Sequence, residues 1–380
     1  MGRATRVLLS RSALLHNLKK VRQKAPKSKV LAMVKAYGYG HGFKVAEYLD
    51  THVDGFGVAA IEEGVKLREQ GITSPIVLME GIFSPEELKR VEEYNFSLVV
   101  HCQEQIDWLY NYTAKIQPIN IWLKLDTGMG RLGFNCTSKE SLDSLIDIYT
   151  SLKKSHKVAE LGLMSHFACA DEPWHELNKK QISAFHRVKK KLPGPYSCAN
   201  SAAIFNFNNE TYDWVRPGIM LYGISPFADI SAEELDLQPV MHVVTQLISV
   251  KLLRQGEFVG YGATWQCPED MLVGIISLGY GDGYPRLAPN GTPFLVHGER
   301  CGLVGRVSMD MIAIDLRKCP EVSVGEQVTV WGDGLPVEEI AQHVGTIAYE
   351  LVCNMPLRAP YLWQDQVNLA EGVLLAGSEQ

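Results

Sequence analysis

Eight short apolar runs, separated by segments of helical periodicity, occupy the first ~230 residues and constrain the fold more than any other feature. Their nearly continuous apolar character is typical of strands buried on both faces of a parallel sheet. Eight such strands alternating with helices favour an α/β fold with a closed, TIM-like (β/α)8 barrel, and a doubly wound open sheet remains the alternative. The runs are KVLAMVK (29–35), GFGVAA (55–60), PIVLME (75–80), FSLVVH (96–101), IWLKLD (121–126), LGLMSHF (161–167), YSCANS (196–201) and WVRPGIMLYG (214–223).

The pattern changes after about residue 235, where helical periodicity nearly vanishes and Val, Ile and Leu runs are punctuated by glycine. Segments such as MLVGIISLGYGDGYPR and EQVTVWGDG indicate strands joined by turns, and PVEEIAQHVG indicates one short helix. The polar, proline-bracketed stretch 226–239 marks the boundary. We therefore expect a barrel domain over residues 1–235 and a mostly-β domain over residues 236–380.

The composition argues against several classes of protein. The formal charge is -6, from 37 basic and 43 acidic residues without a basic block, so nucleic acid is not an expected partner. The 8 cysteines are scattered without a Cys-x-x-Cys pair, which suits reduced thiols in the cytoplasm. Charged residues interrupt the N-terminal apolar runs, so neither a signal peptide nor a membrane span is expected there.

Polar residues close several of the apolar runs, and in a barrel ligands bind at the carboxyl ends of the strands. Each residue has an ordinary explanation by itself, because strand-end lysines usually reach water and histidines in apolar runs usually hydrogen-bond within the core. Together, at the ends of five buried strands, they are costly to place unless they form a site. The residues are Lys35, Lys124, Asp126, Arg131, His166, Asn200, Ser201 and Arg216.

These residue types favour an anionic ligand. The chain lacks a nucleotide P-loop motif, and so many cationic groups around His166 would repel a metal ion, so no metal is expected. Desolvation lowers the pKa of a lysine in an apolar strand, so the amine of Lys35 can form a Schiff base. Phosphate sites in barrels form after strands seven and eight, where Ser201 and the amides of Gly218 and Ile219 are expected. An imine-forming lysine and a phosphate cradle together indicate pyridoxal 5′-phosphate.

Eight motifs in order make the sequence similar to a known family. They are AMVKAYGYGHG, KLDTGMGRLGF, SHFACADE, CANSAA, RPGIMLYG, GYGATW, LGYGDGYPR and GRVSMDM. On these motifs the chain closely resembles the bacterial alanine racemases along nearly its whole length. The resemblance implies a pyridoxal-phosphate enzyme with an N-terminal α/β barrel and a mostly-β C-terminal domain, acting as a head-to-tail homodimer with shared active sites.

The resemblance also implies roles for barrel residues around the cofactor. Lys35 would hold the cofactor as a Schiff base, and Arg216 would face its pyridine nitrogen. The remaining cofactor-binding residues would be Tyr39, Ser201 and the amides of Gly218 and Ile219 at the phosphate, with His166 beside the ring.

Further residues would contact the substrate. Tyr261, in GYGATW, would be the second catalytic residue and would come from the partner subunit. Arg131 would contact the substrate carboxylate and the phenolic oxygen of the cofactor. Met309 and Asp310 of the partner would line the substrate site, and Lys124 aligns with a lysine that many members carry as a carbamate that holds the arginine.

Racemisation of alanine fits two acid–base groups on opposite faces of the substrate, here Lys35 and Tyr261, because one base cannot easily cross the substrate plane. The pKa of a tyrosine is normally near 10, so nearby cationic groups would need to lower it. Arg216 cannot give up its proton, so the pyridine nitrogen should stay unprotonated. Interconversion of L- and D-alanine would supply D-alanine for peptidoglycan.

One position departs from the family pattern. Many relatives have a tyrosine that contacts the phosphate and narrows the substrate path, where this chain has Leu357. Acceptance of serine, or a broad-specificity racemase of the same fold, is therefore an alternative. Decarboxylase relatives carry an acidic partner for the pyridine nitrogen, which Arg216 argues against. Non-catalytic pyridoxal-phosphate carriers lack the β domain with its GYGATW motif.

Overall fold

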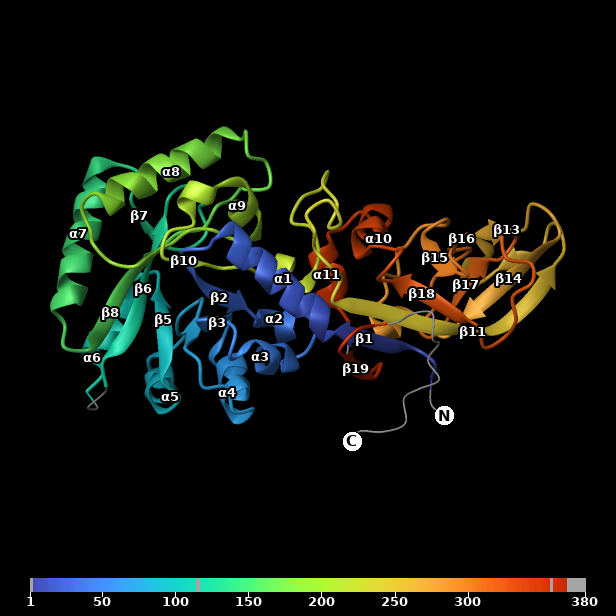
Figure 1. Cartoon of the computed structure of the whole chain (residues 1–380), viewed down its shortest axis with the longest axis horizontal. Helices are drawn as coiled ribbons and strands as arrows, with labels where there is room; N and C mark the ends of the chain where they lie inside the picture. Colours follow the sequence, from blue (N-terminus) through green and yellow to red (C-terminus); the bar gives the residue numbers. More distant parts are fainter. Residues whose placement is uncertain (1–2, 114–116, 356–357, 368–380) are drawn as a thin grey trace. The chain divides into compact units, whose positions relative to one another are not determined.

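The computed structural model describes residues 3–113, 117–355 and 358–367. The chain divides into two compact units, a barrel unit of Asn17–Leu221 and Ser225–Leu235 and a β unit that holds the rest of the chain (Figure 1). The expected barrel range 1–235 includes the described residues 3–16, which the structure groups with the β unit. The reason is strand β1 (Arg6–Ser10), which pairs with strands of that unit and was not expected from the sequence.

Eight parallel strands form the barrel, in the order β5, β4, β3, β2, β10, β9, β8 and β6, and the pairing of β5 with β6 closes it. The structure confirms the expected closed barrel over the open sheet, with one strand in each apolar run. The strands are β2 (Lys29–Met33), β3 (Gly55–Val58), β4 (Ile76–Leu78), β5 (Phe96–Val100), β6 (Ile119–Asp126), β8 (Val158–Met164), β9 (Tyr196–Ser197) and β10 (Trp214–Val215), and the short β7 (Phe134–Asn135) pairs with β6 outside the barrel.

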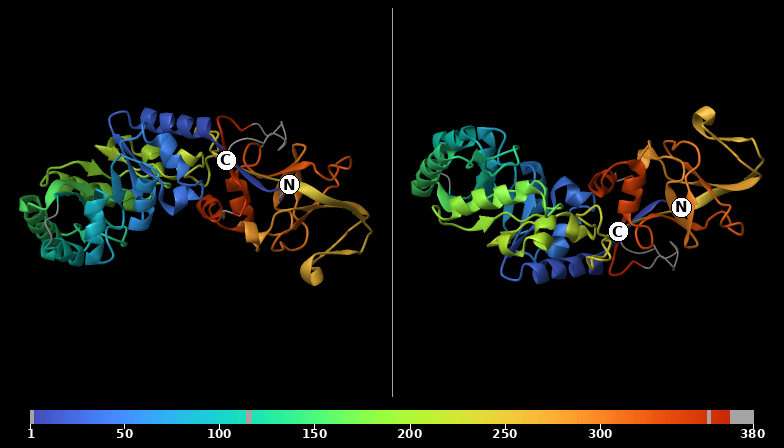
Figure 2. Two further views of the ribbon diagram at one scale, coloured as in Figure 1. Left: turned by 90° about the horizontal axis from the view of Figure 1, so that it is seen from below. Right: turned by 90° about the horizontal axis from the view of Figure 1, so that it is seen from above.

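Helices α4 to α8 surround these strands on the outside (Figures 1 and 2). The longest of them, α7, begins with Ser138, whose hydroxyl accepts the Ser141 amide, and buries Leu142 and Leu145 along one face. The helical segments are α1 (Arg11–Lys24), α2 (Lys35–Tyr39), α3 (Lys44–Leu49), α4 (Ile61–Glu69), η1 (Pro85–Glu87), α5 (Leu88–Glu93), α6 (Gln103–Asn111), α7 (Lys139–Lys154), α8 (Glu176–Lys189), α9 (Ser201–Asn206), η2 (Asn208–Glu210) and η3 (Ile219–Tyr222).

Large side chains fill the barrel interior. Trp122 packs with Leu31, Val77, Val99 and Met164, which come from different strands. The Trp122 ring fits because the neighbouring strand carries Gly162, where a Cβ would lie 2.6 Å from a ring atom. The barrel interior is therefore a packed core without room for a ligand, which directs attention to the barrel mouth.

The β unit is built on the long strand β11, which pairs with β1, β14 and β18. The strands are β1, β11 (Met241–Leu253), β12 (Phe258–Val259), β13 (Trp265–Gln266), β14 (Met271–Ile276), β15 (Pro293–Val296), β16 (Glu299–Gly302), β17 (Ile312–Asp315), β18 (Gln327–Trp331) and β19 (Tyr361–Gln364). The helical segments are η4 (Tyr261–Ala263), η5 (Tyr280–Asp282), α10 (Val337–Val344) and α11 (Ala348–Cys353). The unit is mostly β as expected, and α10 is the expected helix. Helix α11 was not expected, because its six residues are too few to show a helical period in the sequence.

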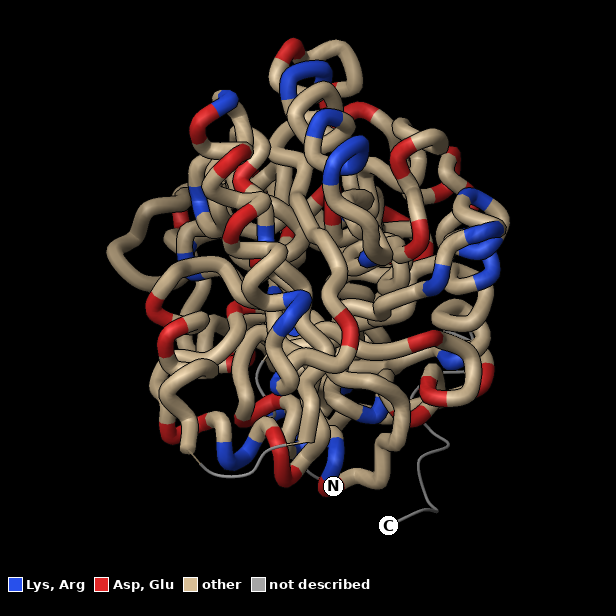
Figure 3. Tube along the Cα trace, turned by 90° about the vertical axis from the view of Figure 1, so that its left-hand side faces the viewer, with Lys and Arg blue, Asp and Glu red and all other residues tan. Residues whose placement is uncertain are grey.

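Acidic and basic residues are interspersed along the chain on the face shown in Figure 3. Within the described ranges, the helices are all too short or too polar to span a lipid bilayer.

Candidate functional site

A left-handed turn follows the first barrel strand. Strand β2 stops at Met33, and the half-buried Lys35 opens a turn in which φ is 53° at Ala36, 56° at Tyr37, 62° at Gly38 and 51° at Tyr39. Left-handed backbone costs about 1–2 kcal/mol for each residue with a Cβ, so this conformation persists only where the surroundings enforce it. The sequence predicts that Lys35 ends the strand, whereas in the structure it follows the strand and begins the turn.

Glu63 of α4 holds the start of this turn. Its Oε1 accepts the Ala36 amide at 2.6 Å, and its Oε2 accepts the Ala59 amide at 2.7 Å. The carboxylate thus joins the loop after β2 to the loop after β3. Sequence reasoning missed Glu63, because a glutamate in the first turn of a helix is an ordinary feature.

The turn brings Tyr39 against the loop after β10. Tyr39 is buried, and a Cβ at Gly218 would overlap its hydroxyl. The Ser201 Oγ accepts the Gly218 amide at 2.9 Å and lies 3.4 Å from the Met220 amide. The Tyr39 hydroxyl and the Ser201 hydroxyl thus lie close to Gly218, and the amides of Gly218 and Met220, on either side of Ile219, point to Ser201 Oγ. Hydroxyl and amide groups of this kind suit a phosphate group.

Arg216 is buried next to strand β10, and burial lowers its pKa to about 10. Its guanidinium donates to Ser197 Oγ and to the Ser165 carbonyl at 2.5 Å each, and to the Cys198 carbonyl at 3.2 Å. Its Nη2 also lies 3.2 Å from His166 Nδ1. The arginine stays cationic at neutral pH and is held rigidly. Ser165 and Cys198 lie in the quoted motifs SHFACADE and CANSAA, but the sequence did not predict their role in holding Arg216.

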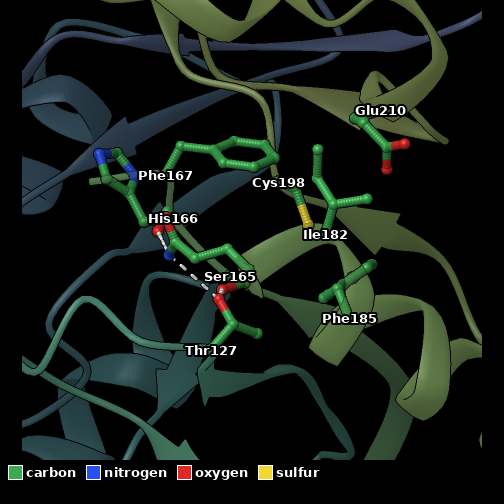
Figure 4. A pocket seen from close by; sticks show the side chains of 9 residues that line it. Thr127, Ser165, His166, Phe167, Ile182, Phe185, Cys198 and Glu210 are labelled. Atoms are coloured by element: carbon green, nitrogen blue, oxygen red, sulfur yellow. Dashed lines mark hydrogen bonds between the residues drawn. The ribbon is translucent and has the colours of Figure 1, made fainter. Parts of the chain in front are cut away.

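His166 lies beside Arg216 at the end of β8. Its pKa is well below the ordinary value because of burial and then because of the charges of Arg216, Lys124 and neighbouring cations. The imidazole is therefore neutral at physiological pH, and Nδ1 accepts from the arginine, which can only donate. The Gln181 amide donates to the His166 carbonyl at 2.8 Å. Figure 4 shows the ring directed away from the small cavity behind it, which Cys198 and other side chains line.

Lys124, near the end of β6, is buried among cations. Burial lowers its pKa to about 8, and the charges of Arg216, Arg131 and Lys35 contribute to the same shift in that order of effect. These neighbouring charges bring four basic residues, from three of the quoted sequence motifs, together at one barrel mouth. Glu80 opposes the shift of Lys124 only as the smallest influence, so the cluster favours binding of an anion or neutralisation of an amine.

The barrel mouth fits pyridoxal phosphate. It offers a lysine amine at Lys35, a cradle of donors around Gly218, and a buried guanidinium that can face the pyridine nitrogen. Lys124 at the end of β6 thus meets Lys35, Arg131 and Arg216 from other segments of the barrel unit. Asp126, which was also predicted, instead accepts the amides of Gly128 and Gly130.

The other predicted residues lie in the β unit. Tyr261, in η4, is 71% exposed and Met309 is 54% exposed, so both side chains are available to another surface. The Gly260 backbone before the tyrosine packs on Arg306, near the Ser308–Asp310 turn. Asp310 accepts a hydrogen bond from Arg358, which lowers the pKa of its carboxyl. Leu357, the predicted departure from the family pattern, lies outside the described residues.

Two family models match the chain. The one described as "Alanine racemase, N-terminal domain" matches residues 9–226, and the one described as "Alanine racemase, C-terminal domain" matches residues 240–363. Together they cover both structural units.

Relatives match along nearly the full length. The chain is 46% identical over 369 residues to an alanine racemase of Coxiella burnetii (strain RSA 493 / Nine Mile phase I), with 95% of this chain and 99% of the relative covered. It is 45% identical to that of Shewanella amazonensis, covering 93% and 97%. The crystal structure of the biosynthetic alanine racemase from Pseudomonas aeruginosa matches with a TM-score of 0.91 and 42% identity, covering 96% of this chain and 100% of that chain.

Proposed function

The chain belongs to the alanine racemase family, and from this premise we propose that it interconverts L-alanine and D-alanine with pyridoxal 5′-phosphate bound at the barrel mouth. The observation that carries the proposal is the meeting of Lys35, the cationic cluster and the donor cradle at Gly218 on one end of the barrel. The β unit, with its exposed Tyr261, favours catalysis over a role as a cofactor carrier.

Separate residues would bind the phosphate of the cofactor, its aldehyde carbon and the substrate carboxylate. Tyr39, Ser201 and the amides of Gly218 and Ile219 would hold the phosphate, and Lys35 would hold the aldehyde carbon. Pyridoxal phosphate, when bound, withdraws electron density from the substrate Cα and makes its C–H bond acidic. Arg131 would orient the substrate carboxylate, with Met309 and Asp310 of the partner subunit closing the substrate site.

Two residues would move protons at Cα. Lys35 would exchange a proton on one face, and Tyr261 of the partner subunit on the other, because inversion needs a proton removed from one side and returned to the opposite side. The high exposure of Tyr261 in the single chain supports this assignment, since a catalytic tyrosine must be covered when it works.

Arg216 would keep the pyridine nitrogen of the cofactor unprotonated, so that the nitrogen accepts a hydrogen bond from the guanidinium. Its buried guanidinium can only donate, so it offers the nitrogen no removable proton at neutral pH. The neutral imidazole of His166 beside it is too weak an acid to protonate the nitrogen. Electron withdrawal is then weaker than with an acidic partner, which disfavours side reactions.

Lys124 would be carbamylated. Its pKa of about 8 leaves a large neutral fraction near that pH, and only a neutral amine combines with carbon dioxide. The product is an anion among Arg131, Arg216 and Lys35, so it would relieve the repulsion between them.

Complementation between inactive variants tests both the chemistry and the shared site. Lys35→Ala and Tyr261→Phe should each lower racemisation by at least about 100-fold. If the tyrosine comes from the partner, mixing the two proteins after subunit exchange should restore up to about a quarter of the wild-type rate, because half of the dimers are mixed and one site in each is intact.

A matched control is Tyr110→Phe, which removes an exposed hydroxyl that bonds Ser151 on the barrel surface. It should leave the rate unchanged. Absence of alanine racemisation by the wild-type holoenzyme would reject the proposed function, and a failure of complementation would place both residues in one chain. L-serine, assayed in parallel, reports the strictness for alanine. The family activity supports a role in supplying D-alanine for peptidoglycan, in the cytoplasm.

A further inference from the structure

Asp282 is a buried carboxylate in the β unit, at the end of η5. It is 1% exposed, and its Oδ2 accepts the Gly279 amide at 3.0 Å and the Arg3 guanidinium at 2.8 Å. The Nε of Arg358 lies 3.6 Å from its other oxygen. A buried carboxylate is expensive unless it is paired, and here two arginines, far apart in the sequence, meet the same group.

The same two arginines extend to Asp310. Arg358 Nη2 donates to Asp310 Oδ1 at 2.5 Å, and Arg3 Nη1 donates to the same oxygen at 3.2 Å. Arg3 Nη2 also donates to the Asp310 carbonyl at 3.1 Å. Asp282 therefore fixes two guanidiniums that in turn hold both the side chain and the backbone of Asp310.

Backbone hydrogen bonds join the two loops directly. The Tyr280 amide donates to the Ser308 carbonyl at 3.0 Å, and the Gly281 amide donates to the Met309 carbonyl at 2.9 Å. A Cβ at Gly279 would overlap the carbonyl oxygens of Ser308 and Met309, so the two loops approach as closely as backbone allows. A shift of Asp282 would therefore be transmitted to Met309.

Met309 has little packing of its own to fix it. Its side chain is flexible and 54% exposed, so its position depends on the turn that carries it. We propose that Asp282, acting through Arg3 and Arg358, is a positioning residue that holds Met309 and Asp310 in the wall of the substrate site and so sets its preference for small amino acids. The inference rests on the proposed function, in which these two residues face the substrate.

The test is Asp282→Asn in the holoenzyme, which keeps the shape and removes the charge. Loosening the wall should raise KM for L-alanine about tenfold, equal to about 1.4 kcal/mol, while kcat stays within about twofold because Lys35 and Tyr261 are untouched. The ratio of kcat/KM for L-serine to that for L-alanine should rise. Cofactor absorbance and oligomeric mass should match the wild type, which separates positioning from unfolding. Arg358→Lys should cause a smaller change than Arg358→Ala.

Arg317→Ala is the matched control. It removes ion pairs to Asp315 and Glu269 in the same unit, and these partners lie outside both loops. Wild-type KM and an unchanged serine ratio in Asp282→Asn would overturn the inference, as would a fall in kcat alone. Should that variant not fold, the same comparison of KM with kcat in Arg3→Ala and Arg358→Ala tests the inference. A wild-type enzyme without alanine racemisation would instead reject the proposed function.

Discussion

Gly218→Ala tests the phosphate cradle, because the added Cβ has no room beside Tyr39. The methyl carbon would overlap the tyrosine hydroxyl and lie 3.0 Å from the ring carbon that bears it. Tyr39 is buried on a left-handed turn, so its ring cannot swing aside freely. The hydroxyl would be displaced from the phosphate that we assign to it.

The magnitude follows from the hydrogen bond that the displaced hydroxyl can no longer donate to the phosphate. A hydrogen bond to a charged group contributes about 1.5–3 kcal/mol, which corresponds to about 10- to 150-fold weaker cofactor binding. Tyr39→Phe removes the same bond without adding a Cβ and should weaken binding to a similar extent. If both changes act on one hydroxyl, the double variant should bind about as weakly as either single variant, instead of showing the product of the two factors.

The assay is equilibrium titration of the apoenzyme with pyridoxal phosphate, followed by the visible absorbance of the lysine-linked cofactor. Circular dichroism should show that all three variants are folded. Wild-type affinity in Gly218→Ala would refute the predicted overlap, and multiplicative effects in the double variant would show that Tyr39 and Gly218 act independently.

Two other predictions concern the barrel. The pKa of Lys124 is about 8 in the folded chain and near 10.4 in the unfolded chain. Between these two pH values the unfolded state therefore binds more protons than the folded state. The contribution of Lys124 to the free energy of unfolding thus rises with pH through that window. Isotope-labelled bicarbonate should give a carbamate resonance that strengthens as the pH rises through about 8 and that Lys124→Met lacks; an equal signal in the variant would disprove the assignment. Gly162→Ala should lower the free energy of unfolding by about 1–3 kcal/mol in urea titrations, because its Cβ would lie 2.6 Å from the Trp122 ring. Trp122→Phe should recover part of that stability, and no recovery would mean that the ring is not the obstacle.

The sequence alone determined the barrel, because eight apolar runs with helical segments between them leave few other ways to bury that surface. It also identified the polar residues at the strand ends as candidates for a site, since burying a charge costs free energy unless a partner or ligand compensates it. Identification of the family came from motifs, and Tyr261 and Met309 depended on that resemblance because an exposed tyrosine in a turn has no distinguishing pattern.

The tertiary structure decided which contacts hold those residues in place. The left-handed turn after Met33, its anchor Glu63, and the supports of Arg216 depend on contacts between loops far apart in the sequence. Strand β1 joins the β unit through register with β11, which its short apolar run could not reveal. The pairing of Asp282 with two arginines is of the same kind: pairings between distant residues arise from the packed chain, whereas local periodicity records only how each segment meets its own neighbours.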